Sequence, residues 1–293
     1  MIRFKKVDYE ISNIVRAFVA GSSGAGKTTL IEQMLLSNLF PYKRVLYCHP
    51  DFHNEVPVNW VLPGKHLFFQ AGLPTESDIL ELIPETVLIL DDLFQLASDS
   101  PDIDYLFRVL SGKRKIHVFI LTQRYFANGR FTVSIRNSCN YHILMNNADA
   151  TVNSTAGRKM GLKREITKAI DLNRSKPFPY IFVDRTPAAR ISGLCVFIDI
   201  FKKKVIIGDM LYYLFTEADF NNSFKQVEDN IAIRHGGNTS STIPDTSTSD
   251  KKDESNTKVE TEQGRFHSHY ARRRQITREV QKALRRYQKR SQL

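Results

Sequence analysis

Residues 21 to 28 read Gly21-Ser22-Ser23-Gly24-Ala25-Gly26-Lys27-Thr28, which matches the phosphate-binding pattern G-x-x-x-x-G-K-[ST] at every fixed position. The glycines let the backbone wrap closely around a phosphate and point several N–H groups at it. We expect Lys27 to reach the β- and γ-phosphate oxygens and the Thr28 hydroxyl to ligate Mg²⁺. The predicted nucleotide-binding residues are Gly21, Ser22, Ser23, Gly24, Ala25, Gly26, Lys27, Thr28 and Thr29.

The segments on either side of this loop supply the context that phosphate binding needs. Residues 15–20 are apolar except for Arg16 and predict a strand that enters the loop, and residues 27–39 predict a helix that leaves it. Such a helix directs the positive end of its dipole at the phosphates. A merely structural Gly/Ser loop is the alternative, but strand, loop and helix together favour a nucleotide site.

A second apolar strand, residues 86–90, is followed by Asp91 and Asp92. In the phosphate-loop plan the first acid holds the magnesium ion, so Asp91 and Thr28 are the predicted metal ligands. Asp92 is then positioned to polarise the attacking water as a general base. The alternative for Asp92 is the N-cap of a helix that begins just after it.

A third strand, residues 117–121, ends in Thr122-Gln123-Arg124. A polar residue at the tip of a strand inserted between the phosphate-loop strand and the acidic strand reaches the γ-phosphate or the attacking water. This insertion defines the additional-strand class of P-loop proteins and separates its motors from nucleotide kinases. We predict that Gln123 is this sensor, against the alternative of an ordinary loop residue.

Three arginines, Arg124, Arg130 and Arg136, lie in the turn-rich stretch that follows. An arginine here could act in trans on the nucleotide of a neighbouring subunit, where it would stabilise charge on the γ-phosphate. Arg136 is the predicted catalytic arginine. A solvated arginine, or one that contacts a DNA phosphate, is the alternative.

Short β-rich segments alternate with helix-like segments up to about Ile233, which predicts an α/β P-loop fold with a mostly parallel central sheet covered by helices on both faces. Residues 1–235 are therefore the predicted ATPase domain. The predicted strands are 15–20, 44–48, 66–69, 86–90, 117–121, 141–145, 180–184 and 194–201, and the predicted helices are 27–39, 76–82, 102–110 and 163–172.

The composition changes sharply at Gly236. Residues 236–264 hold little that could be buried and predict a disordered linker. Residues 265–293 form a basic tail with apolar positions at helical spacing, which predicts a short helix. The tail has four candidate roles: binding DNA phosphates, docking on a capsid, nuclear import, or simple solubility.

The formal net charge of +11 favours an anionic partner, above all nucleic acid. Cys48, Cys139 and Cys195 are too far apart for a zinc site, and their odd number argues against a disulfide framework. No segment has signal-peptide or membrane-spanning character. We therefore expect an intracellular protein with no membrane span.

Several motifs together resemble those of the poxvirus-type genome-packaging ATPases of the FtsK–HerA superfamily, in particular those of Polinton-type elements, adintoviruses and virophages. The resemblance runs from residue 15 to residue 201 and rests on the phosphate loop, Gly72-Leu73-Pro74, the Asp91-Asp92 strand, Leu121-Thr122-Gln123-Arg124, and the run from Arg136 to Asn147. Relatives of this family usually have Gln-Asn at the position of Gln123-Arg124, and Phe-x-Asn-Pro-Arg at residues 145–149. Because this chain lacks the arginine of the second motif, these two differences bear most on which residue is the trans arginine.

The resemblance implies a homo-oligomeric ring that uses ATP and Mg²⁺ to drive double-stranded DNA into a preformed viral capsid through a portal-like vertex. It implies that Lys27 and Thr28 are the Walker A pair, that Asp91 and Asp92 are the Walker B pair, and that Gln123 is the sensor. The expected location is the host nucleus, a virus assembly site, or the virion. Three alternatives remain: a helicase or a replication- or transposition-associated ATPase, a small-molecule kinase, and a DNA- or capsid-binding protein with a regulatory ATP site.

Overall fold

The computed structural model describes residues 2–6, 9–11, 14–51, 57, 59–145, 149, 151–208 and 210–215. The predicted linker (236–264), the basic tail (265–293) and residues 216–235 of the predicted ATPase domain lie outside these residues, as do Asn146 and Asn147. Within the described part of the chain, no helix combines the length and the apolar character that crossing a bilayer requires.

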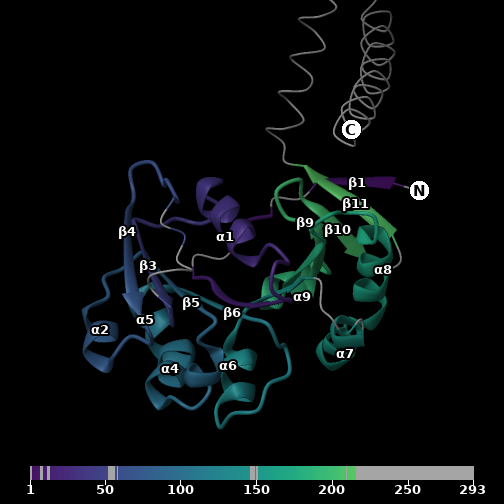
Figure 1. The fold of residues 1–293 in the computed structure, drawn as a ribbon. Coiled ribbons are helices and arrows are strands. Elements are labelled where there is room, and N and C mark those ends of the chain that lie inside the picture. Colours follow the sequence, from purple (N-terminus) through teal and green to yellow (C-terminus); the bar gives the residue numbers. More distant parts are fainter. Residues whose placement is uncertain are drawn as a thin grey trace, which may run out of the picture. The chain divides into compact units, whose positions relative to one another are not determined.

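One sheet of 11 strands runs through the described unit in the order β1-β11-β10-β9-β8-β7-β2-β6-β5-β3-β4 (Figure 1). The half of the sheet from β7 to β4 in this order is parallel throughout, which confirms the predicted α/β class. All six predicted strands of this half are present, with bounds that differ by at most two residues. They are β2 (Arg16–Ala20), β3 (Arg44–His49), β4 (His66–Ala71), β5 (Thr86–Asp91), β6 (His117–Thr122) and β7 (Tyr141–Met145).

Strand β6 lies between β2 and β5, so the sheet has the strand insertion of the additional-strand class. Ala20 pairs with Thr122, and Asp91 pairs with Leu121. Because the three strands are parallel and in this register, their carboxyl ends meet at one edge of the sheet. The segments after β2, β5 and β6 are therefore brought together there.

The other half of the sheet is antiparallel from β7 onward. The predicted strand 180–184 is β8, and the predicted strand 194–201 is shorter in the structure. Three strands were not predicted: β1, and the hairpin of β10 and β11, which closes around Gly208 at φ +58°. The strands of this half are β8 (Tyr180–Asp184), β9 (Val196–Asp199), β10 (Lys204–Ile207), β11 (Met210–Phe215) and β1 (Ile2–Lys6).

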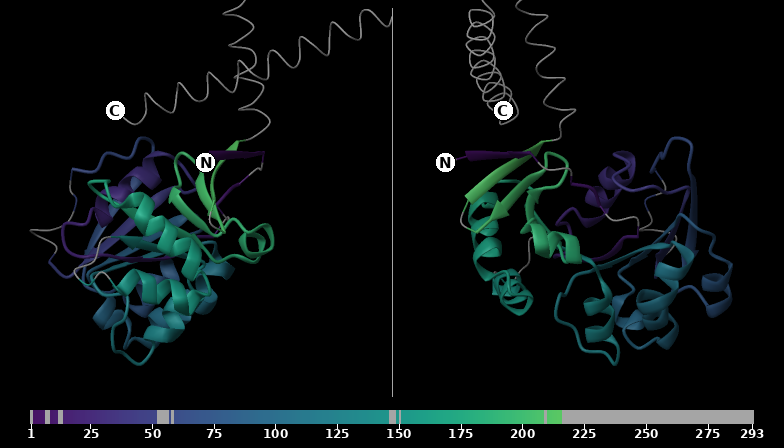
Figure 2. Two further views of the ribbon diagram at one scale, coloured as in Figure 1. Left: turned by 90° about the vertical axis from the view of Figure 1, so that its right-hand side faces the viewer. Right: turned by 180° about the vertical axis from the view of Figure 1, so that it is seen from behind.

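Helices cover both faces of the sheet, as predicted (Figures 1 and 2). Helix α1 packs against one face with four buried side chains (Leu30, Ile31, Met34 and Leu35), and every other helix except α5 contributes side chains to the core on the other face. The helices are α1 (Lys27–Leu36), α2 (Glu76–Glu81), α3 (Phe94–Ala97), α4 (Pro101–Tyr105), the π-helix η1 (Leu106–Leu110), α5 (Ser111–Arg114), α6 (Thr132–Ser138), α7 (Thr151–Met160), α8 (Lys163–Asn173) and α9 (Pro187–Ser192).

The predicted helices differ from the observed ones mainly at their ends. Helix α1 stops three residues before the predicted end, and Asn38 just beyond it adopts a left-handed backbone with φ +46°. The predicted helix 102–110 is part of a longer helical run, α4-η1-α5, which begins where the Ser100 hydroxyl accepts a bond from the Ile103 amide. All three cysteines are buried free thiols, in agreement with the absence of a disulfide framework.

Candidate nucleotide-binding site

The phosphate loop connects β2 to α1, and its glycines adopt backbone conformations that other residues rarely reach. Gly24 has φ +72° and Gly26, the N-cap of α1, has φ +87°. The Lys27 ammonium donates to the carbonyl oxygens of Gly21 at 2.9 Å and Ser22 at 3.0 Å, which holds it over the loop. Burial lowers the pKa of Lys27, and the carboxylates of Asp91 and Asp92 oppose this shift.

Asp91 ends strand β5 and is 9% exposed. The Thr28 hydroxyl lies 3.5 Å from its Oδ2 atom, and the hydroxyl of Tyr47 at the end of β3 donates a short hydrogen bond to the same oxygen. Burial raises the pKa of Asp91, whereas the Tyr47 bond and the charge of Lys27 act to lower it. The two predicted metal ligands are thus next to each other.

The donor set at this point fits magnesium. Mg²⁺ prefers hard oxygen ligands, and it commonly takes one or two protein ligands beside phosphate oxygens and water. The Thr28 hydroxyl and the Asp91 carboxylate supply such a pair. The described residues contain no group of three or more His, Cys, Asp or Glu that could hold a metal ion without a phosphate.

Asp92 follows β5 with a left-handed backbone, φ +55°. Its carboxylate accepts from the Gln123 side-chain amide, with Nε2 at 3.3 Å from Oδ1 and 3.1 Å from Oδ2. Helix α3 starts two residues later, at Phe94, with Leu93 as its N-cap and without a side-chain cap bond. Asp92 therefore does not cap the helix, and the structure brings it together with the predicted sensor instead.

These residues line one cavity of about 470 Å³ at the carboxyl edge of β2, β5 and β6. Gly21, Ser22 and Ala25 of the loop are not among its lining residues, although Gly21 and Ser22 hold Lys27 by their carbonyls. The lining consists of Ser23, Gly24, Gly26, Lys27, Thr28, Thr29, His49, Asp91, Asp92, Gln123 and Phe178.

Three residues of the site, Tyr47, His49 and Phe178, were missed in the sequence. Tyr47 and His49 lie at the end of β3, which is adjacent to β5 in the sheet. The signal was present in principle, because polar residues at the carboxyl end of a parallel strand tend to face the ligand. To recognise this signal one must know that β3 lies beside β5, and the sequence did not predict that neighbour.

Arg136 does not line the cavity. It is half-buried on α6, where its Nη1 donates to the Tyr125 carbonyl at 3.1 Å and its guanidinium lies 5.4 Å from the ring centroids of Tyr125 and Phe126. Arg124 and Arg130 are exposed. A role of Arg136 on a neighbouring subunit's nucleotide stays a prediction.

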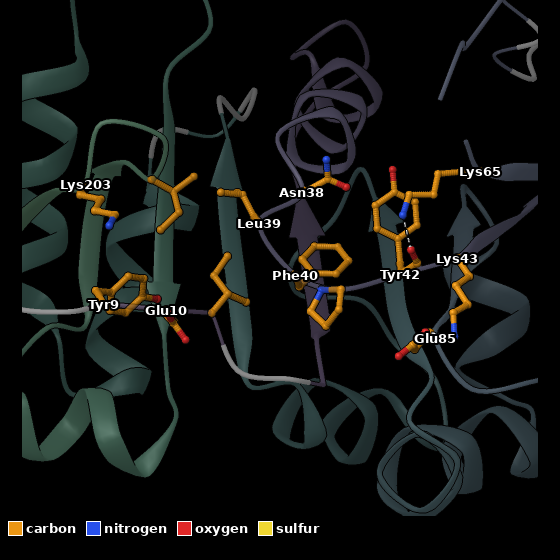
Figure 3. A pocket seen from close by; sticks show the side chains of 13 residues that line it. Tyr9, Glu10, Asn38, Leu39, Phe40, Tyr42, Lys43, Lys65, Glu85 and Lys203 are labelled. Atoms are coloured by element: carbon orange, nitrogen blue, oxygen red, sulfur yellow. Dashed lines mark hydrogen bonds and ion pairs between the residues drawn. The ribbon is translucent and has the colours of Figure 1, made fainter. Parts of the chain in front are cut away.

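A larger cavity, about 650 Å³, lies at the opposite edge of the sheet (Figure 3). Its lining includes Tyr42, Lys43, Lys65 and Glu85, which precede β3, β4 and β5. Lys43 pairs with Glu85 at 2.7 Å, and Lys65 donates to the Tyr42 carbonyl at 2.6 Å. None of the phosphate-loop, Asp91 or Gln123 atoms reaches this edge, so we assign the nucleotide chemistry to the smaller cavity.

The strand order, the loop and the acids that face it define the class: the chain has the fold and the site of a P-loop NTPase of the additional-strand class. No protein-family model matches the chain, and no curated protein matches it either.

Among solved structures, the chain is similar to the genome-packaging NTPase B204 of Sulfolobus turreted icosahedral virus 2, with 11% identity and a TM-score of 0.42 over 60% of this chain and 94% of that one. It is also similar to B204, the DNA-packaging ATPase of Sulfolobus turreted icosahedral virus, with 13% identity and a TM-score of 0.39 over 59% and 92%. The ATPase DotB of Legionella pneumophila shows 11% identity and a TM-score of 0.31 over 49% and 46%. At these values the assignment to the P-loop class rests on the motif and the strand order.

Proposed function

We propose that this protein is an ATPase that uses Mg²⁺-ATP to move double-stranded DNA, as a motor that packages a viral genome into a capsid. The observation that carries the ATPase part is the hydrogen-bonded pair of Asp92 and Gln123 in the same cavity as Lys27 and Thr28. A base and a polar sensor at the far end of a phosphate loop are the groups that hydrolysis of a γ-phosphate needs.

In this proposal Lys27 binds the β- and γ-phosphate oxygens, and Thr28 and Asp91 hold the magnesium ion. The ion, when bound, supplies positive charge to the phosphate oxygens. Asp92 accepts a proton from the water whose oxygen attacks the γ-phosphorus, while the bond to the β–γ bridging oxygen breaks and ADP leaves. The Gln123 amide, hydrogen-bonded to Asp92, orients that water and keeps the carboxylate directed at it.

The position of β6 supports a motor rather than a nucleotide kinase. In a kinase of the P-loop fold the acidic strand would be the direct neighbour of the phosphate-loop strand. Here β6 separates β2 from β5 and carries Gln123 at its tip. The third alternative, a protein whose ATP site is only regulatory, does not explain why Asp92 and Gln123 are hydrogen-bonded to each other in the cavity.

The DNA part of the proposal is supported by charge and by motif resemblance. The net charge of +11 favours a polyanion, and contacts to phosphates hold any duplex regardless of its sequence. The proposed assembly is a homo-oligomeric ring that docks on a capsid or a portal-like vertex, in the host nucleus, at a virus assembly site or in the virion. The alternative is a helicase, or a replication- or transposition-associated ATPase, which would use the same site.

Blunt duplex DNA is expected to raise the rate of ATP hydrolysis at least severalfold at low salt, and the stimulation should fall steeply as salt rises. The measurement is phosphate release by the full-length chain with duplex DNA, with single-stranded DNA and with free nucleosides. Unchanged turnover with duplex DNA would refute the translocase while leaving the ATPase in place. Directional strand separation of a forked duplex would establish the helicase instead.

Replacing Tyr47 by phenylalanine is expected to raise the Mg²⁺ concentration for half-maximal hydrolysis by about tenfold, since a hydrogen bond to a charged group contributes roughly 1.5–3 kcal/mol. The reason is that the Tyr47 hydroxyl orients the Asp91 oxygen that faces Thr28. Tyr42→Phe is the matched control, because it removes a buried hydroxyl that donates to the Leu35 carbonyl at 3.0 Å, outside the site. Equal Mg²⁺ dependence of Tyr47→Phe and the unmodified protein would show that Asp91 needs no such support.

A further inference from the structure

Phe178 is a large aromatic side chain that the predicted chemistry leaves without a role. It is 62% exposed, yet it lines the same cavity as Lys27 and the two acids. It comes from the segment between α8 and β8, about 150 residues along the chain from the phosphate loop. An exposed phenyl ring in a polar cavity has apolar surface to bury against a ligand.

The ring lies against the last glycine of the loop. A Cβ atom built on Gly26 would be 3.5 Å from the Phe178 Cδ1 atom and 3.8 Å from its Cγ atom. Strand β8 is antiparallel to β7, so its amino end, next to Phe178, lies at the edge where β2 and β7 end. Phe178 therefore borders the site on the β7–β8 side, whereas Asp91, Asp92 and Gln123 border it on the β5–β6 side.

The position of the phosphates determines the direction in which the nucleoside of a bound nucleotide extends across the cavity. With its γ-phosphate at Asp92 and Gln123 and its β-phosphate in the loop, a nucleoside triphosphate extends its nucleoside away from the acids. The cavity has Phe178 in that direction. An aromatic face there can stack on a nucleobase, an interaction that tolerates different bases because each base has a π-face.

The segment that carries Phe178 is held at both ends. The Asn173 side-chain amide donates to the Tyr180 carbonyl at 2.7 Å, the Lys176 amide donates to the Asn173 carbonyl at 2.9 Å, and the Lys176 ammonium donates to the Ile198 carbonyl at 3.1 Å. Pro177 and Pro179 flank the ring and restrict the backbone on both sides. The ring is thus presented in place before a ligand arrives, which lowers the entropic cost of stacking.

We propose that Phe178 is the stacking platform for the base of the bound nucleoside triphosphate. This inference rests on the proposed ATP site and deepens it. Stacking contacts the face of the base and makes no hydrogen bonds to its edge. Phe178 therefore contributes affinity for purine nucleotides in general and discriminates little between ATP and GTP.

The test compares a ligand that has a base with one that has none. Full-length protein, Phe178→Ala and Phe178→Trp are titrated with a non-hydrolysable ATP analogue, its GTP counterpart and inorganic tripolyphosphate, all with Mg²⁺. Phe178→Ala is expected to weaken both nucleotides by about tenfold to 100-fold and to leave tripolyphosphate within about twofold of the unmodified protein. Phe178→Trp should restore nucleotide binding, and Phe68→Ala, which removes an exposed phenyl of β4 outside the cavity, should change neither ligand.

Two results would overturn the inference while leaving the ATP site intact. One is unchanged nucleotide affinity in Phe178→Ala, including the case in which only oligomer assembly changes and the ring serves as a subunit contact. The other is an equal loss for nucleotide and tripolyphosphate, which would mean that Phe178 only shapes the loop. If the unmodified protein bound neither ligand, the proposed ATP site itself would be wrong, and this inference with it.

Discussion

Replacing Lys27 by alanine is expected to lower ATP turnover by about 10³-fold or more and to weaken ATP binding, because charge-assisted contacts to the transferred phosphate supply much of the stabilisation in phosphoryl transfer. Among the described residues that line the cavity, Lys27 is the one lysine or arginine. Its ammonium already sits over the loop, where it donates to two carbonyl oxygens. Because no second lysine or arginine of the described residues lines the cavity, none of them can replace it.

Phosphate release and ATP titration of the full-length protein measure the two effects. Lys43→Ala is the control, since it removes a lysine of the opposite cavity whose ion pair with Glu85 is solvent-exposed and contributes little to stability. If Lys27→Ala kept turnover within about tenfold of the unmodified protein, the phosphate loop would not be part of the catalytic site.

Replacing Asp92 by asparagine is expected to leave ATP binding nearly unchanged and to lower turnover by about 10²- to 10⁴-fold, the range that a positioned general base contributes. Asparagine keeps the size of the side chain and an oxygen that can accept the Gln123 amide, so the local contact survives while the base is lost. Asp91→Asn should also raise the Mg²⁺ concentration needed for half-maximal hydrolysis, because Asp91 lies next to Thr28 at the proposed metal position.

Single-turnover hydrolysis at saturating ATP separates the loss of chemistry from the loss of binding. Asp171→Asn provides the control, as it neutralises an exposed carboxylate on α8 that pairs with Arg174 and does not line the cavity. Normal turnover in Asp92→Asn would leave Asp91 as the functional acid and would assign activation of the water to another group.

The positions of the phosphate loop, of Asp91 and Asp92 and of Gln123 were predictable because each follows or lies at the end of an apolar strand, and the strands themselves follow from β-branched runs. Tyr47 and Phe178 were not, since their relevance depends on which strands are neighbours in the sheet. The β10–β11 hairpin was missed for a related reason: the strands are short, and their apolar residues are buried only in the folded sheet, where Ile206 and Val205 join the two different core clusters. Asp92 does not cap α3 and has a left-handed backbone torsion, which the sequence does not specify.

That torsion also limits how this position can vary in descendants of the gene. A left-handed backbone at residue 92, φ +55°, suits glycine and, among residues with side chains, asparagine and aspartate best. In the proposed mechanism glycine and asparagine would remove the base, so aspartate is the side chain that satisfies both the backbone and the proposed chemistry. A glutamate, equally acidic, would cost about 1 kcal/mol or more in backbone strain and would move its carboxylate away from Gln123. Related sequences that keep this backbone conformation are therefore expected to keep aspartate at position 92. A change to glutamate would require the backbone of the loop after β5 to change as well.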